Sequence, residues 1–207
     1  MSNVFQCLNS LIHFKELFIK NVMNLASVVA VTLAASAAQG AIVQYSATLS
    51  GASESPPNSS PATGSATFDF DTITHSLTMS INFSGLVGTT TVAHIHADTA
   101  VAGTGTAGVA SGLTGWTTGL NSGTYTNTIN LLSTSSYSSA YLAAHGGTAA
   151  SAETDLLSAM SIGKAYLNLH STAYPGGEIR GFINQVPAPG MLALIGMCGV
   201  LTARRRR

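Results

Sequence analysis

Apolar and polar side chains alternate along several short segments of this chain, and this alternation constrains the fold more than any other feature. Between residues 77 and 83 every second residue is large and apolar: Leu77, Met79, Ile81 and Phe83. A repeat of two residues is the period of a β-strand, and the polar residues in between indicate that only one face is buried. The same pattern recurs at residues 44–49 and 65–71.

The remaining local signals predict a mostly β protein. Further strands are predicted at residues 90–96, 123–131, 164–170 and 178–184. The short link 72–75 predicts a hairpin, and Pro175-Gly176-Gly177 is typical of a turn because Pro fixes one dihedral and Gly permits a positive φ. Two short helices are predicted at residues 136–145 and 152–160, the second beginning at Ala152, Thr154 or Asp155. This pattern indicates an antiparallel sandwich or barrel.

The stretch from residue 41 to residue 185 has the length of one domain and a distinctive charge. Both cysteines of the chain, Cys7 and Cys198, lie outside it, so a disulfide does not stabilise it. Its only strong cations are Lys164 and Arg180, against seven acidic residues, which gives a net charge of −5. Nucleic-acid binding needs a basic surface, and we therefore exclude it as a function.

Residues 1–40 have the layout of a secretory signal peptide. Lys15 and Lys20 precede an apolar stretch at residues 22–35, which is expected to be helical, and small residues follow it. This order matches a basic region, an apolar region and a cleavage site. We expect signal peptidase to cut between Gly40 and Ala41, with the bond between residues 37 and 38 as the alternative.

The last residues, 186–207, form a three-part tail. Val186-Pro187-Ala188-Pro189 precedes an apolar run at residues 191–203, and four arginines end the chain. The run predicts a short helix that is marginal for spanning a bilayer, which needs ~20 residues. Positive charge resists translocation, so the arginines hold the end of the chain on the cytoplasmic side. The tail therefore predicts a transient membrane tether.

This tail resembles the PEP-CTERM sorting signal of bacteria that make exopolysaccharide. Val186, Pro187 and Pro189 match the Val-Pro-Glu-Pro motif of that family, and Ala188 replaces its Glu. The resemblance implies processing by an exosortase-type membrane enzyme, whereas an ordinary C-terminal anchor is the alternative. Either interpretation places the body outside the cytoplasm, in the cell envelope, at the cell surface or in the extracellular matrix of a Gram-negative-type bacterium.

Three motifs carry the side chains that are most suited to metal binding or catalysis. His94 and His96 share one face of a predicted strand because alternate residues point the same way, and Asn168 and His170 do so on another. Converging imidazoles are frequent metal ligands, so His94, His96 and His170 are candidates for a divalent metal site. The interpretation that we favour is that the histidines are structural and donate to a carbonyl or to Asp98, and that the protein needs no cofactor.

A third motif follows the Gly176-Gly177 turn. Glu178 and Arg180 share a face, which predicts an ion pair between them. In a metal site, Glu178 would orient a ligating imidazole. No motif of a nucleophile elbow, a phosphate loop or a metalloprotease is present, so we expect no enzymatic activity.

These motifs together resemble the CHRD domain, named for chordin, an extracellular antagonist of growth factors. HIH at residues 94–96, YLNLHSTAYPGGEIRGFI at residues 166–183 and the opening at residues 47–57 carry the likeness, which covers about residues 45–183. The likeness implies an immunoglobulin-like β-sandwich without established catalysis. Its family-motif residues here are His94, His96, Asn168, His170, Gly176, Gly177, Glu178 and Arg180.

The sequence therefore predicts an exported binding or structural module with three parts: residues 1–40, 41–185 and 186–207. Its expected partners, besides the two processing enzymes, are exopolysaccharide or envelope proteins. The alternative is a metal-binding protein or metal-dependent enzyme that uses the three histidines.

Overall fold

The computed structural model describes residues 41–187. The predicted signal helix in residues 1–40, the apolar C-terminal helix at residues 191–203, and Gly40, Ala188 and Pro189 at the predicted cleavage sites lie outside the described residues. None of the helices formed by the described residues has the length and apolar character needed to cross a bilayer.

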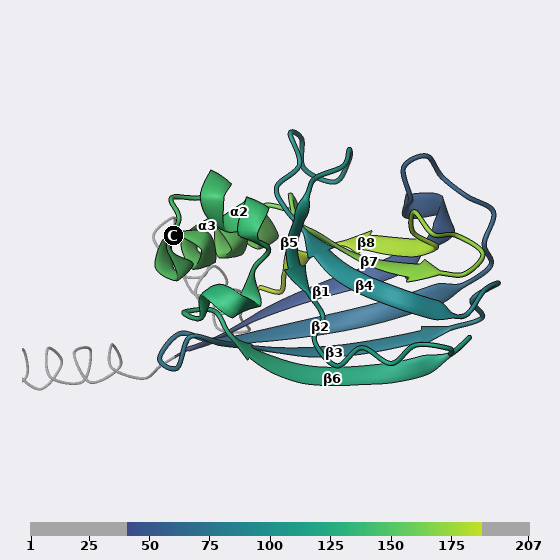
Figure 1. Ribbon diagram of the computed structural model, residues 1–207, viewed down its shortest axis with the longest axis horizontal. Helices are drawn as coiled ribbons and strands as arrows, with labels where there is room; N and C mark the ends of the chain where they lie inside the picture. Colours follow the sequence, from purple (N-terminus) through teal and green to yellow (C-terminus); the bar gives the residue numbers. More distant parts are fainter. Residues whose placement is uncertain (1–40, 188–207) are drawn as a thin grey trace, which may run out of the picture. The chain divides into compact units, whose positions relative to one another are not determined.

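One antiparallel sheet makes up most of the domain (Figure 1). Its strands are ordered β5-β4-β7-β8-β1-β2-β3-β6, and β9 pairs with β1. The strands are β1 (Ile42–Ser50), β2 (Thr63–Asp71), β3 (Ser76–Ser84), β4 (Thr90–His96), β5 (Val109–Gly112), β6 (Gly123–Asn130), β7 (Tyr166–Ser171), β8 (Ile179–Phe182) and β9 (Asn184–Gln185). The sheet curls into a half-barrel, with its core on the concave side.

The predicted β class, antiparallel pairing and short helices are confirmed, but the two separate sheets of an immunoglobulin-like sandwich are not. Strand β8 pairs with both β7 and β1, so it joins the two halves of the sheet. Gly181 permits this approach, because a Cβ atom at that position would overlap the backbone carbonyl of Thr48 on β1. The absence of one side chain therefore keeps the sheet continuous at this point.

Strand β3 shows why the alternating sequence gives this sheet. Its residues with odd numbers, from Leu77 to Phe83, are buried, whereas the residues between them are exposed or half-buried. The predicted hairpin is confirmed, since β2 and β3 pair along their whole length. Its turn includes His75, whose φ of 55° is positive.

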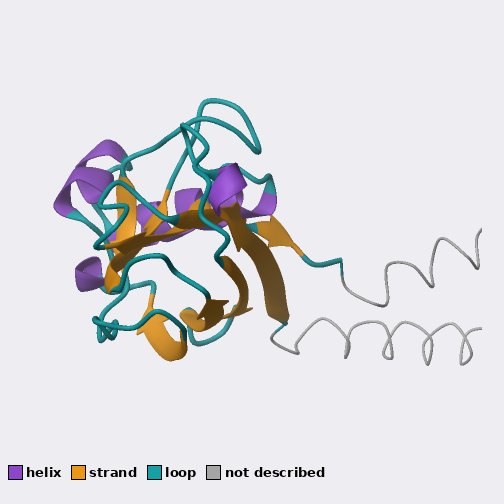
Figure 2. Cartoon of the chain, turned by 90° about the vertical axis from the view of Figure 1, so that its right-hand side faces the viewer, coloured by secondary structure: helices purple, strands orange, loops and turns teal. Residues whose placement is uncertain are grey.

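Two helices, α2 (Ser139–Ala144) and α3 (Ala149–Ser161), pack against the core at one end of the strands (Figure 1). Helices are purple in the view turned by 90° (Figure 2). Gly146 and Gly147 end α2 with positive φ angles, as predicted. The predicted start of α3 was wrong: the helix begins at Ala149 because the Thr148 side chain accepts a hydrogen bond from the N–H of Ser151. Short 3-10 helices occupy Gly51–Ser53 and Thr134–Ser136.

Strand β5 was not predicted. It has four residues, of which Ala110 and Ser111 are both buried, so its burial does not alternate. It nevertheless matters for the site, because it pairs with β4 on the side opposite β7.

Candidate functional site

The three predicted histidines lie together on the polar face of β4 and β7. The strands pair so that His94 lies opposite Asn168 and His96 lies opposite Tyr166. Opposite residues point to the same face of a sheet, and His170 follows Asn168 by two positions. One ring nitrogen of each histidine lies within 4.8 Å of the others. The apolar neighbours Ile95 and Leu169 point into the core.

Two backbone carbonyls orient two of the rings. Nδ1 of His96 lies 2.9 Å from the carbonyl oxygen of Ala107, and Nδ1 of His170 lies 2.8 Å from that of Pro175. A carbonyl only accepts, so the hydrogen-bond network assigns the proton to Nδ1 in both rings and leaves a lone pair on Nε2. Nε2 of His170 lies 3.4 Å from Nδ1 of His94.

The surroundings of the cluster disfavour the charged forms of His94 and His96. Burial, reinforced by His170 and His96, lowers the pKa of His94 to about 4. Burial also lowers the pKa of His96, whose ring stacks on Tyr166 at 4.7 Å between centroids. The Nε2 atom of His96 is inaccessible to solvent and has no hydrogen-bond partner among the described residues.

Arg180 forms the next layer beyond Tyr166. Its guanidinium lies 4.7 Å from the centre of the Tyr166 ring, so it and the His96 ring both contact this tyrosine. It donates hydrogen bonds to the backbone oxygens of Ser53 and Gly105. These contacts tie the loops after β1 and β4 to the polar face of the sheet.

The predicted ion pair between Arg180 and Glu178 is wrong. The carboxylate near Arg180 belongs to Glu54, with 3.9 Å between Nε and Oε2. Burial raises the pKa of Glu54 to about 7, although the charge of Arg180 opposes this rise. The prediction failed because strands show which residues share a face, but not which loop folds over them.

The Glu178 carboxylate binds groups from two loops, not Arg180. Its fully buried carboxylate accepts hydrogen bonds from Ser60 Oγ at 2.7 Å and from the N–H groups of Val87 and Gly88 at 2.6 and 3.4 Å. It therefore joins two loops to the turn before β8. The expected role of Glu178 in orienting an imidazole is also wrong, since the two carbonyl oxygens do this.

The glycine turn lies against buried polar groups. Gly177 has a φ of 131°, and a Cβ atom there would lie 2.6 Å from Nδ2 of Asn168 and 2.9 Å from Oε1 of Glu54. Only glycine fits at this position without displacing them. Gly176 is exposed and open to substitution by this criterion.

Residues that sequence reasoning missed are mainly those that support the histidines. The carbonyls of Ala107 and Pro175 belong to the backbone, so no side chain marks them. Tyr166 belongs to a recognised motif but was not assigned a role. His145, which lies 2.8 Å from Asp155, was not singled out either.

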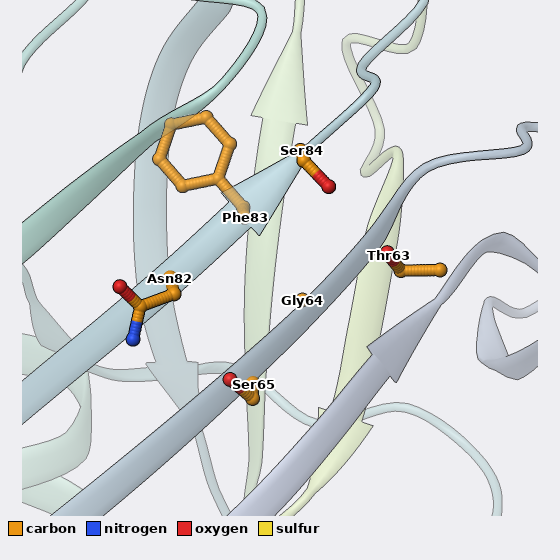
Figure 3. Close-up of a pocket in the computed structure, with 6 residues that line it drawn as sticks. All are labelled: Thr63, Gly64, Ser65, Asn82, Phe83 and Ser84. Carbon is orange, nitrogen blue, oxygen red and sulfur yellow. The ribbon is translucent and has the colours of Figure 1, made fainter.

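Away from the histidines, an open pocket lies between the ends of β2 and β3 (Figure 3). The residues that line it are Thr63, Gly64, Ser65, Asn82, Phe83 and Ser84. None of these side chains titrates near neutral pH, so the pocket is suited to hydrogen bonding with a neutral partner.

Comparison with known proteins is informative at the level of the family. The model of the CHRD domain matches residues 45–183, from β1 to the residue after β8. This chain belongs to the CHRD domain family. The match includes all eight predicted family-motif residues of the CHRD domain. No curated protein and no solved structure matches the chain.

Proposed function

We propose that this CHRD protein is an exported, non-enzymatic module of the cell envelope that binds exopolysaccharide. The proposal combines the CHRD match with the leader at residues 1–40 and the PEP-CTERM-like tail at residues 186–207. The observation that carries the binding role is a broad face of hydroxyl and amide side chains on the sheet.

This face, called here the hydroxyl face, covers the outer side of β2, β3 and β6. Register places Thr67, Ser80 and Thr126 in one row across the three strands, with Ser65, Asn82 and Thr124 in the next. Most of these side chains are exposed, and the pocket in Figure 3 lies at one end of the face. Such groups both donate and accept hydrogen bonds, as the hydroxyls of a sugar chain do.

The charge of the body supports a neutral partner. A body with a net charge of −5 repels polyanions, whereas an uncharged polysaccharide meets no such barrier. The absence of cysteine from residues 41–185 makes the fold independent of disulfide formation.

The two ends of the described body support a tethered module. Tyr45 lies opposite Gln185 on β9, and the N–H of Val186 donates to the carbonyl of Gln44 at 2.8 Å. The chain therefore enters β1 and leaves β9 at neighbouring strands. Signal cleavage before Ala41 and processing after Val186 would therefore act close to each other on the domain.

Fractionation of the producing bacterium tests the export part of the proposal. We expect the parent chain in the envelope or the medium, and a variant without residues 2–40 in the cytoplasm. Recovery of the parent in the cytoplasm would contradict export.

Co-sedimentation with purified exopolysaccharide tests the binding part. The double variant Thr67→Glu/Thr126→Glu adds charge to the hydroxyl face without touching the core, and we expect it to bind at least about tenfold more weakly. A matched control, Ser158→Glu/Ser161→Glu, adds the same charge on α3 and should bind like the parent. Equal binding by both variants, or crosslinking to an envelope protein in place of polysaccharide, would overturn the assignment of the partner.

A further inference from the structure

We propose that His94, His96 and His170 form a binding site for one zinc-class divalent metal ion on β4 and β7, separate from the hydroxyl face. The inference does not depend on export or on polysaccharide binding.

The ring nitrogens of His94 and His170 have the spacing of two ligands on a tetrahedral ion. Bonds of 2.0–2.1 Å at the tetrahedral angle place two ligand nitrogens ~3.3–3.4 Å apart. Nδ1 of His94 and Nε2 of His170 are 3.4 Å apart, and the candidate atoms of all three rings lie within 4.8 Å. A square-planar ion would need neighbouring nitrogens ~2.9 Å apart, which is closer than the nitrogens of His94 and His170.

The hydrogen bonds around the cluster have the form of a metal's outer shell. Ligating histidines usually donate the proton of their other ring nitrogen to a carboxylate or a carbonyl, which fixes the tautomer. His96 and His170 both do this through Nδ1, to Ala107 and Pro175. Their Nε2 atoms therefore carry the lone pair that a metal requires.

A purely structural role explains only part of this arrangement. A hydrogen bond from Nδ1 of His94 to Nε2 of His170 would satisfy two of the rings without a metal. It leaves Nε2 of His96 buried without a partner among the described residues. A buried acceptor without a partner costs roughly 1–3 kcal/mol, whereas a metal ion would satisfy it.

The site would accept a fourth ligand. Three histidines leave one position of a tetrahedral ion open for a further ligand. The ligand set is neutral and Arg180 is close to it through Tyr166, so the charge around the ion would favour water or an anion in that position.

Isothermal titration of the purified protein with ZnCl₂, after treatment with a chelator, tests the site. We expect one ion per chain and a rise in melting temperature. His96→Gln and His170→Gln should each weaken binding by at least about 100-fold, since loss of outer-shell partners alone costs 10–100-fold. His75→Gln is the matched control, because this histidine lies outside the cluster and contacts Glu153; it should bind like the parent.

X-ray absorption at the zinc edge gives an answer even if a variant fails to fold. The zinc-loaded parent should show three imidazole nitrogens at about 2.0–2.1 Å. Absence of saturable binding, equal loss of binding in His75→Gln, or an ion with fewer than three imidazole ligands would overturn the proposal. Failure of export or of polysaccharide binding would leave these measurements unaffected.

Discussion

Replacing Glu178 by glutamine tests how this fold holds its loops without a disulfide. The substitution keeps the size of the side chain and removes its charge. Glu178 is fully buried and accepts hydrogen bonds from Ser60, Val87 and Gly88. The glutamine amide has only one oxygen that can accept a hydrogen bond. Its NH₂ group takes the place of the second carboxylate oxygen, and it cannot accept the hydrogen bonds that this oxygen accepted.

The expected cost follows from these contacts. A hydrogen bond to a charged group contributes ~1.5–3 kcal/mol and a neutral one ~1 kcal/mol, while a buried donor left unpaired costs ~1–3 kcal/mol. Two weakened hydrogen bonds and one unpaired N–H would lower the free energy of unfolding, and the easier burial of a neutral group offsets part of this loss. The net cost is about 2–4 kcal/mol. The midpoint of guanidinium unfolding should fall by the corresponding amount. Asp69→Asn, which removes the same charge from a more accessible side chain bonded to Gln44, should cost less than ~1 kcal/mol.

The pH dependence gives a second test of Glu178. Burial raises the pKa of this carboxyl, but the hydrogen bonds that it accepts outweigh burial and hold the pKa below its ordinary value of 4.5. A lowered folded pKa contributes stability above pH 4.5, and this contribution is lost as the pH falls through the folded pKa. The difference in stability between the parent and Glu178→Gln should therefore shrink below pH 4.5. Equal unfolding midpoints at pH 7, or a difference that grows in acid, would refute the assigned role.

Three further predictions concern the core and the polar layer. Phe83→Ala should cost ~3–5 kcal/mol in denaturant titration, because it truncates a buried aromatic, whereas Ser80→Ala on the other face of β3 should cost little. Gly181→Ala should cost at least ~1–3 kcal/mol and expose amides of β1 and β8 to hydrogen exchange, since its Cβ overlaps the Thr48 carbonyl. The pKa of Glu54 in the folded protein is raised to about 7. As the pH rises from 4.5 to 7, the free energy of unfolding of the parent should therefore fall relative to that of Glu54→Gln, by on the order of 3 kcal/mol. A difference between the two proteins that does not change with pH would contradict the burial of this carboxyl.

The strands could be predicted from the sequence wherever one face is buried. Alternation at residues 77–83 gave β3, and the prediction for residues 90–96 has the bounds of β4. Alternation did not reveal β5, whose neighbouring residues Ala110 and Ser111 are both buried. It also did not show that β8 would join β1, since a period of two identifies faces and not neighbours.

The candidate site was predictable to a similar extent. The spacing His94-Ile95-His96 placed two imidazoles on one face, and Asn168 with His170 on another. Their convergence depends on the pairing of β4 with β7, which joins residues 70 or more positions apart. The partner of Arg180 was missed because Glu54 lies in a loop that has no periodic pattern.

Intact-mass measurement of the protein recovered from the envelope or the medium tests the proposed exported module most directly. The account predicts a chain that begins at Ala41 and ends between residues 186 and 190. Signal peptidase would remove residues 1–40, and the exosortase-type enzyme would remove the apolar run and the terminal arginines. A mass that retains residues 1–40 and the four terminal arginines would contradict it.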